Sequence, residues 1–180
     1  MDLFLIRHAQ SSNNALEITD ESSKRVADPP LTEKGRNQVA LVAGAVATGA
    51  HLSGSERADG RRRLDFLYCS AMTRALETAS GIGHALDLSP QLWLEVHEVG
   101  GIWLEEDGEI ADLRGLTRRD LIDQFPLVAI EDDFAAEGWW PGGLEPEEVR
   151  DERAAVVAGA LWARAGEDSR IGIVSHGGFM

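Results

Sequence analysis

The chain of 180 residues is poor in cysteine and in positive charge. Cys69 is the single cysteine, which excludes a disulfide framework and a cysteine metal cluster. Its place in an apolar run predicts a core residue. Seventeen lysines and arginines stand against thirty-one aspartates and glutamates, a formal net charge of −14 at pH 7. Because so acidic a chain repels phosphate backbones and anionic lipids, we expect neither nucleic acid nor a membrane among its partners.

Long apolar runs are lacking as well. The first run, residues 3–6, has only four residues between the charges of Asp2 and Arg7, which is too short for a signal peptide. No segment approaches the length that crosses a bilayer. Internal repeats and low-complexity tracts are also missing. The length then predicts a single domain over residues 1–180, and the cytoplasm is the expected location.

Short apolar strands alternate with longer helices along the chain. The predicted strands are residues 3–6, 64–70, 92–94 and 170–175, and the predicted helices are residues 33–49, 71–86, 117–126 and 146–165. Thr32 and Thr117 are expected to cap the N-termini of two helices. This alternation predicts an α/β fold, a three-layer α-β-α sandwich with a central, mostly parallel sheet.

The first and last long helices each show a candidate buried face. The spacing assigns these faces to Val39, Val42 and Val46 in the first helix, and to Val149, Val156, Ala160 and Leu161 in the last.

Three predicted strands lead into residues that phosphate chemistry uses. Arg7 and His8 follow the first strand, Arg74 lies in the first turn of the helix after the second, and His176 follows the last. Parallel strands bring their carboxyl ends to one edge of the sheet, where ligands bind. Guanidinium groups bind phosphate oxygens, and a neutral imidazole can attack phosphorus. The sequence therefore predicts a site for a small phosphorylated substrate at this edge.

A reaction at phosphorus also needs a carboxylic acid to protonate the leaving oxygen. Glu98 and Glu95, after the third predicted strand, are both candidates. His97 either lines the pocket or packs behind it. The histidines have no close ligand spacing, so we expect no metal and no cofactor.

Five motifs in order resemble those of the histidine phosphatase superfamily, also called phosphoglycerate-mutase-like proteins. "LIRHAQSSNN" is similar to the opening Arg-His-Gly-Glu-Thr-x-x-Asn motif, and "PLTEKGRNQ" and "YCSAMTRALETA" are similar to the next two. "HEVGGIW" resembles the segment with the acid, and "VSHGGFM" resembles the second-histidine motif. The resemblance runs essentially from end to end and is closest to the phosphatase branch.

The resemblance implies a role for each matching residue. His8 would be the nucleophile that becomes phosphorylated. Arg7, Arg74 and His176 would hold the phosphoryl oxygens, and Asn14 would add a polar contact. The resemblance also implies that no metal is required.

The resemblance favours Glu98 over Glu95 as the proton donor. The opening motif departs from the family pattern at Ala9, Gln10 and Ser11, which replace glycine, glutamate and threonine. Because this segment borders the pocket, we expect the departures to affect substrate preference.

The sequence ends at Met180, directly after the second-histidine motif, where the family pattern continues into a helix. We therefore expect a sandwich truncated at the C-terminus, with exposed apolar surface and a homodimer as one outcome.

The leading functional hypothesis is a phosphomonoester hydrolase that acts through a phosphohistidine. A cofactor-dependent phosphoglycerate mutase would use the same site, with extra positive charge from Arg114, Arg118 and Arg119. A non-catalytic binding module on the same fold is the third alternative. Specificity is expected from residues 100–145, where "GWWPGG" would form an apolar wall.

Overall fold

The computed structural model describes residues 1–16, 24–54, 56, 63–131, 134 and 136–180. A four-stranded sheet lies at its centre, and each neighbouring pair of strands is parallel. In spatial order the strands are β1 (Asp2–Arg7), β6 (Arg170–Ser175), β2 (Phe66–Cys69) and β3 (Gln91–Leu92). The first, second and last predicted strands are confirmed within a few residues.

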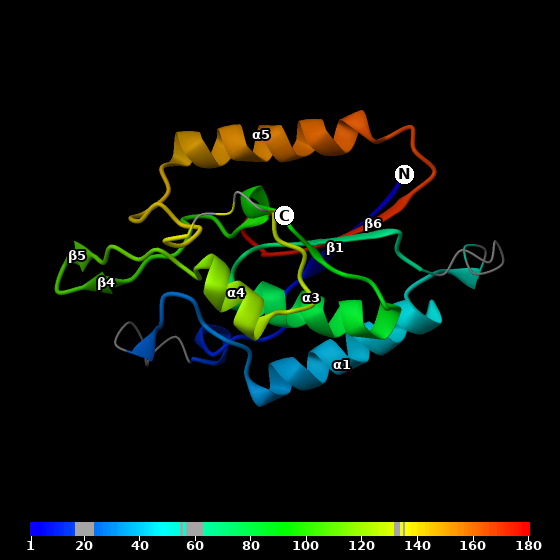
Figure 1. Cartoon of the computed structure of the whole chain (residues 1–180), viewed down its shortest axis with the longest axis horizontal. Helices are drawn as coiled ribbons and strands as arrows, with labels where there is room; N and C mark the ends of the chain where they lie inside the picture. The colour runs from blue at the N-terminus through cyan, green and yellow to red at the C-terminus, as the bar shows by residue number, and fades with distance from the viewer. Residues whose placement is uncertain (17–23, 55, 57–62, 132–133, 135) are drawn as a thin grey trace.

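Helices cover both faces of this sheet (Figure 1). The helices α1 (Glu33–Thr48) and α3 (Thr73–Leu86) pack together on one face, and α5 (Glu147–Ala163) lies across the other. The short helix α4 (Arg118–Gln124) joins the core on the side of α1 and α3. The predicted α-β-α layers with a parallel sheet are therefore confirmed.

The predicted caps and the core position of Cys69 are also confirmed. Thr32 accepts a hydrogen bond from the backbone N–H of Gly35, and Thr117 forms a reciprocal capping box with Asp120. Cys69 is fully buried between the layers, and burial raises the pKa of its thiol to about 12. The thiol is therefore an inert packing group.

The register of the parallel strands places the residues of the predicted site at one edge of the sheet. Arg7 pairs with Ser175, and Cys69 pairs with Val174, so β1, β6 and β2 end at the same level. The ladder continues past β1, because the backbone N–H of His8 donates to the carbonyl of Ser175 at 2.9 Å. His8 and His176 therefore leave neighbouring strands side by side.

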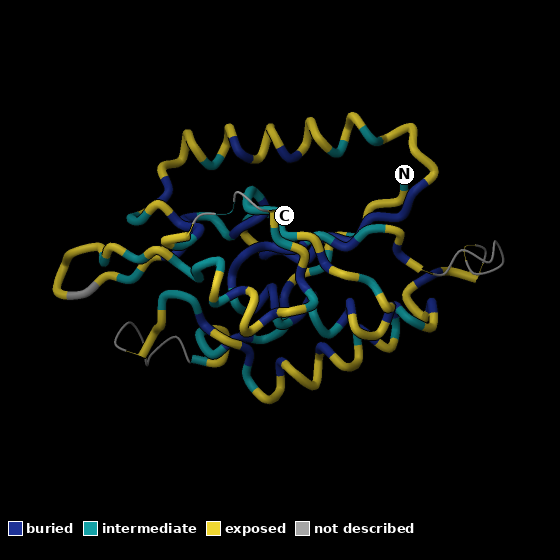
Figure 2. The backbone as a smooth tube through the Cα atoms, in the orientation of Figure 1, coloured by how far each residue is buried: buried dark blue, intermediate teal, exposed yellow. Residues whose placement is uncertain are grey.

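The predicted buried face of α5 is wrong except at Leu161, which packs against the core. Val149 and Val156 are 49% and 61% exposed, whereas Arg153 and Val157 are buried. Figure 2 shows the outward side of this helix as exposed. The apolar pattern misled because an arginine with a full set of partners can replace an aliphatic residue on an inward face. The predicted face of α1 is largely right, with Val39 and Val46 buried.

The segment after α3 departs most from the predicted elements. The third strand covers only two residues and leads into a 3₁₀ turn, η3 (Leu94–Val96). A small antiparallel hairpin, β4 (Glu105–Glu106) with β5 (Glu109–Ile110), projects from the body at the left of Figure 1. Asp107 and Gly108 connect it with φ of 53° and 85°, as in a type I′ turn. No helix in the described ranges is long and apolar enough to cross a membrane.

Candidate active site

A cavity of about 580 Å³ opens at the carboxyl edge of the sheet. Residues between positions 7 and 107 line it, among them Arg7, His8, Asn14, Arg74 and Glu98. The hairpin β4–β5 contributes a further wall. Five of the six predicted site residues therefore line one cavity, although they are up to ninety-one positions apart in the sequence.

His8 is buried, and its hydrogen bonds define its tautomer. Its Nδ1 lies 2.7 Å from the carbonyl oxygen of Ala9. Because a carbonyl oxygen only accepts, Nδ1 carries the proton and Nε2 carries the lone pair. The Nε of Arg74 donates to this Nε2 at 3.2 Å.

The charge state of His8 follows from its surroundings. Burial is the main cause that lowers the pKa of His8 to about 4, and the charges of Arg74 and Arg7 lower it further. The side chain is therefore neutral at pH 7, which is the form that can act as a nucleophile.

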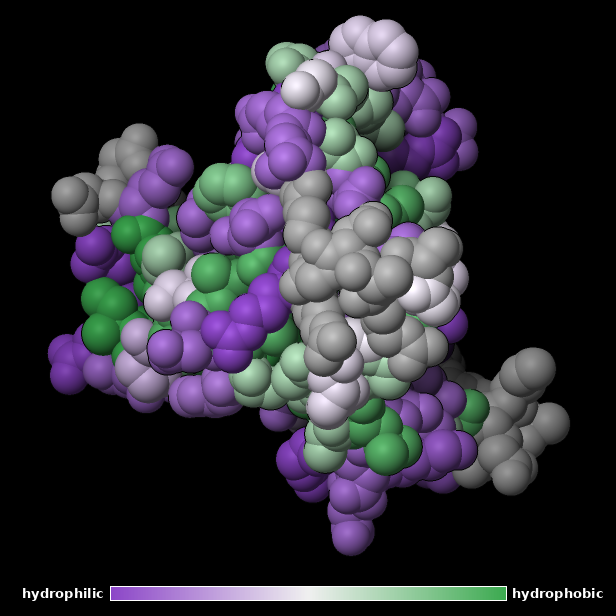
Figure 3. All heavy atoms as spheres, turned by 90° about the vertical axis from the view of Figure 1, so that its right-hand side faces the viewer, coloured by the Kyte–Doolittle hydropathy of each residue, from purple (hydrophilic) through white to green (hydrophobic). Residues whose placement is uncertain are grey.

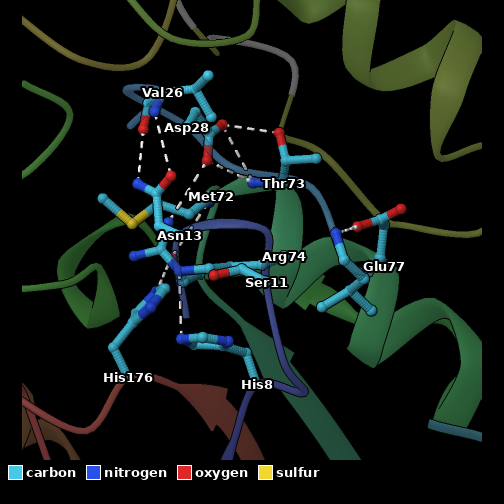
Figure 4. Close-up of polar contacts among 12 residues, drawn as sticks. His8, Ser11, Asn13, Val26, Asp28, Met72, Thr73, Arg74, Glu77 and His176 are labelled. Carbon is cyan, nitrogen blue, oxygen red and sulfur yellow. Dashed lines mark hydrogen bonds and ion pairs between the residues drawn. The ribbon is translucent and has the colours of Figure 1, made fainter. Parts of the chain in front are cut away.

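Arg74 depends on a residue from a distant segment. The helix α3 begins after Met72, whose side chain cannot cap it. Asp28 does so instead, since its carboxylate accepts from the Thr73 backbone N–H at 3.1 Å and from the Thr73 hydroxyl at 2.7 Å. The same carboxylate lies 3.7 Å from the guanidinium of Arg74. Figure 4 shows Asp28 beside Thr73, with Arg74 extending toward His8.

His176 lies beside His8, with the two ring centroids 5.0 Å apart. Its Nε2 is 2.9 Å from the hydroxyl of Ser70, and among the described residues no partner reaches its Nδ1. Burial, followed by the charge of Arg74, holds the pKa of His176 far below its usual range. Both histidines are therefore neutral rings next to a fixed guanidinium.

Glu98 approaches the same edge from the loop after η3. Its carboxylate accepts from the backbone N–H of Val99 at 2.9 Å and from that of Gly178 at 3.4 Å. A Cβ atom on Gly178 would lie 2.6 Å from this carboxylate, so a larger residue there would displace it. Glu95 lines a different cavity, together with Trp139. The geometry therefore favours Glu98 over Glu95 as the acid.

The remaining phosphate-site candidates also reach the cavity. Arg7 is the last residue of β1, and its guanidinium lies over Gly177, where a Cβ atom would be 3.4 Å from its Nε. Asn14 sits in the turn η1 (Asn13–Ala15) and accepts hydrogen bonds from the backbone and hydroxyl of Ser11. Ser11 is the one motif departure that lines the cavity.

Two of the three motif departures lie outside the cavity. Gln10 accepts from the Thr32 hydroxyl at 2.9 Å, so it faces the start of α1. The backbone N–H of Ala9 donates to the hydroxyl of Thr78. Neither residue is among those that line the cavity, so an effect of either on substrate preference would be indirect and stays a prediction.

The apolar wall expected from "GWWPGG" lies at another cavity. Trp139 and Trp140 belong to a small core cluster and line a separate cavity together with Glu95, so they do not line the cavity beside His8. Gly138 folds this loop back at φ 117°, and the Nε1 of Trp140 donates to the carbonyl of Gly143 at 3.0 Å. Trp103 provides the exposed aromatic wall instead, at 41% exposure.

His97 packs behind the cavity and does not line it. It is buried against Trp139 and Trp140, and burial lowers its pKa. This geometry favours the packing alternative. Arg114, Arg118 and Arg119 are not among the residues that line the cavity, so the extra charge expected of a mutase does not come from them.

Sequence reasoning missed several residues of the outer cavity. Arg25 and Asn13 line one side, and Glu105 and Asp107 of the hairpin line the other. The Asp-Gly dipeptide at Asp107 is a signal that could have located the hairpin. For Arg25 the sequence offers no such signal.

The arrangement combines a neutral imidazole with an unprotonated Nε2, two guanidinium groups, a second neutral imidazole and a carboxyl group. These groups are what transfer of a phosphoryl group to and from an imidazole requires. Within the described ranges no group of three or more His, Cys, Asp or Glu side chains is placed to hold a metal ion.

A family model described as the histidine phosphatase superfamily (branch 1) matches residues 3–180. No curated protein matches the chain. Among solved structures, the ecdysone phosphate phosphatase from Bombix mori, in complex with tungstate, has a TM-score of 0.61 at 14% identity, covering 97% of this chain and 72% of that one.

Two further structures are similar. A putative alpha-ribazole-5'-P phosphatase from Escherichia coli has a TM-score of 0.55 at 23% identity, covering 98% of this chain and 73% of that one. The mycobacterial glucosyl-3-phosphoglycerate phosphatase has a TM-score of 0.53 at 20% identity, covering 98% and 74%. At these identities the likeness shows a shared fold.

Proposed function

This chain belongs to the histidine phosphatase superfamily, and we propose that it hydrolyses phosphomonoesters of small metabolites through a phosphohistidine on His8. The observation that carries the proposal is the neutral His8, with its Nε2 lone pair beside Arg74 at the cavity. The cavity is much larger than a phosphate group, so it has room for the organic part of a substrate.

In the first step the Nε2 of His8 attacks phosphorus, and the bond from phosphorus to the ester oxygen breaks. Arg7, Arg74 and His176 bind the phosphoryl oxygens, on which charge develops. Glu98 gives its proton to the departing oxygen, so the product leaves as an alcohol. The enzyme is left with a phosphorylated His8 and an ionised Glu98.

In the second step water attacks the same phosphorus. The Glu98 carboxylate takes a proton from the water, the bond from phosphorus to Nε2 breaks, and inorganic phosphate is released. His8 returns to its neutral form and Glu98 to its protonated form. No metal takes part in either step of this proposal.

The test compares wild type with His8→Ala on p-nitrophenyl phosphate in the presence of EDTA. We expect turnover by wild type, a loss of at least about a thousandfold in His8→Ala, and acid-labile phosphate on wild type after rapid quenching. His84→Ala is the matched control, because His84 is an exposed histidine of α3.

Equal turnover by wild type and His8→Ala would exclude the mechanism. A folded wild type without turnover would support the non-catalytic binding module. Transfer of phosphate within a phosphoglycerate faster than its hydrolysis would support the mutase.

A further inference from the structure

Arg153 is a buried charge that belongs to none of the five motifs. It lies on the inward face of α5, with 8% of its surface exposed. Its guanidinium binds the Glu145 carboxylate through two parallel hydrogen bonds of 2.7 Å each. Such a bidentate pair fixes the plane and direction of both groups.

The remaining nitrogen of Arg153 binds the chain just before the proposed proton donor. Its Nη1 donates to the carbonyl of Glu95 at 2.6 Å and to the carbonyl of His97 at 3.1 Å. His97 directly precedes Glu98 in the sequence. The guanidinium therefore fixes the backbone on the N-terminal side of Glu98.

Glu145 binds the chain just after the proton donor. Its carboxylate accepts from the backbone N–H of Gly100 at 3.3 Å, and its own N–H donates to the carbonyl of Gly100 at 3.1 Å. Gly100 lies two residues after Glu98. The Arg153–Glu145 pair thus holds the backbone on both sides of Glu98.

Arg153 also reaches the segment that follows the second histidine. Its guanidinium carbon lies 4.6 Å from the centre of the Phe179 ring, in the range of a cation–π contact. Phe179 follows Gly178, whose N–H binds the Glu98 carboxylate. One side chain therefore contacts three segments that surround the acid.

We infer that Arg153, acting through Glu145, is a positioning residue for the proton donor Glu98. A buried ion pair does not in itself stabilise a fold relative to apolar packing, so stability alone does not explain its presence. A general acid, in contrast, must be held within hydrogen-bond reach of the leaving oxygen. This inference rests on the proposed function, because it concerns the acid of that reaction.

The test uses the dependence of the reaction on the leaving group. Nitrophenolate leaves without a proton, whereas an alkoxide needs one, so a misplaced acid slows the alkyl ester selectively. We expect Arg153→Met and Glu145→Gln to lower kcat/KM for an alkyl phosphate at least about tenfold more than for p-nitrophenyl phosphate. Glu98→Gln should show the same selectivity with a larger loss.

The ratio of the two kcat/KM values is taken on one sample, so it does not depend on the folded fraction. Arg153→Lys keeps the charge but loses the paired geometry, and we expect an intermediate ratio. Arg150→Met is the matched control: Arg150 precedes Arg153 by one helical turn and forms ion pairs with Asp151 and Glu147, not with the backbone around Glu98. Its ratio should equal that of wild type.

Equal losses on both substrates would make Arg153 a structural residue and overturn the inference, while His8-dependent turnover would leave the proposed function intact. Turnover that does not depend on His8 would overturn both.

Discussion

At the scale of single residues, His8 in the cavity and His176 beside it are kept neutral by burial and by nearby arginines, and neither has a carboxylate partner among the described residues. Burial removes water from His8 and His176, and the charge of Arg74 disfavours a second positive charge. The bond from His8 Nδ1 to the Ala9 carbonyl then places the lone pair on Nε2. A backbone carbonyl of the neighbouring residue thus selects the tautomer that the proposed reaction needs.

These shifts predict how stability depends on pH. The unfolded chain takes up a proton on His8 near pH 6.5, whereas the folded chain does so near pH 4. The contribution of neutral His8 is therefore complete above pH 6.5 and is lost as the pH falls toward 4. We expect the free energy of unfolding to rise from pH 4.5 to 6.5, with His8 adding up to about 1.4 kcal/mol per pH unit.

Urea unfolding of wild type and His8→Gln at several pH values measures this effect. Carboxylates titrate in both proteins, so the difference between the two slopes isolates His8. The slope should be smaller in His8→Gln, and identical slopes would mean that the pKa of His8 is not lowered.

At the scale of elements, the start of α3 is completed by a carboxylate from outside the helix. Asp28 lies forty-five positions before Thr73 and supplies the acceptor that Met72 lacks. The same carboxylate orients Arg74, the arginine that contacts the proposed nucleophile. The helix cap and the proposed phosphate-binding arginine are therefore coupled through one side chain.

We predict that Asp28→Ala lowers both stability and activity. Loss of the cap should lower the free energy of unfolding by about 1–2 kcal/mol, and loss of the ion pair should lower kcat/KM on p-nitrophenyl phosphate about tenfold. Thr117→Ala is the matched control, because it removes a helix cap at α4, away from the cavity. That variant should lose stability but keep kcat/KM. If Asp28→Ala also kept its kcat/KM, Asp28 would cap α3 without orienting Arg74, and the prediction would be wrong.

The predictions from the sequence were correct where the pattern of a segment matches its surroundings in the fold. The strands β2 and β6 are apolar and lie inside the sheet, and helices α1 and α4 carry their own threonine caps. The apolar run of β1 lies instead at the edge of the sheet, where Leu3 and Leu5 are 37% and 52% exposed. The edge with Arg7, His8, Arg74 and His176 followed from parallel strands alone.

Predictions failed where distant residues determine the outcome. The inward face of α5 contains Arg153 because Glu145 and two carbonyls satisfy its charge, and no local pattern shows this. The "GWWPGG" loop lines a second cavity and not the one beside His8, because Gly101 leaves space for the Trp140 ring to pack inward. The hairpin at Asp107 was missed because its strands are only two residues long.

At the scale of the whole molecule, the cavity depends on segments from both ends of the chain. Residues of β1, α3, the loop after η3 and the end of β6 meet at one side of the molecule. Figure 3 views the opposite end, where hydrophobic residues reach the surface among hydrophilic ones. Leu5 and Trp162 are 52% and 82% exposed. Exposed apolar side chains such as these are compatible with a homodimer, which stays a prediction.

Because the binding groups come from four segments, an oxyanion in the cavity should stabilise the entire fold. Tungstate has the tetrahedral shape of phosphate and forms strong hydrogen bonds to guanidinium groups. At one hundred times its dissociation constant, it should add about 2.7 kcal/mol to the free energy of unfolding and raise Tm by about 5–10 °C. Differential scanning calorimetry across a tungstate titration measures the shift.

The same titration on Arg74→Met and on Arg36→Met separates the cavity from general anion binding. Arg36 lies in α1 and donates to the Leu31 carbonyl, outside the cavity. We expect the shift to vanish in Arg74→Met and to persist in Arg36→Met. An equal tungstate-induced shift in Tm in both variants would mean that the oxyanion binds outside the cavity. If only Arg74→Met loses the shift, the oxyanion binds at Arg74 and stabilises all four segments together.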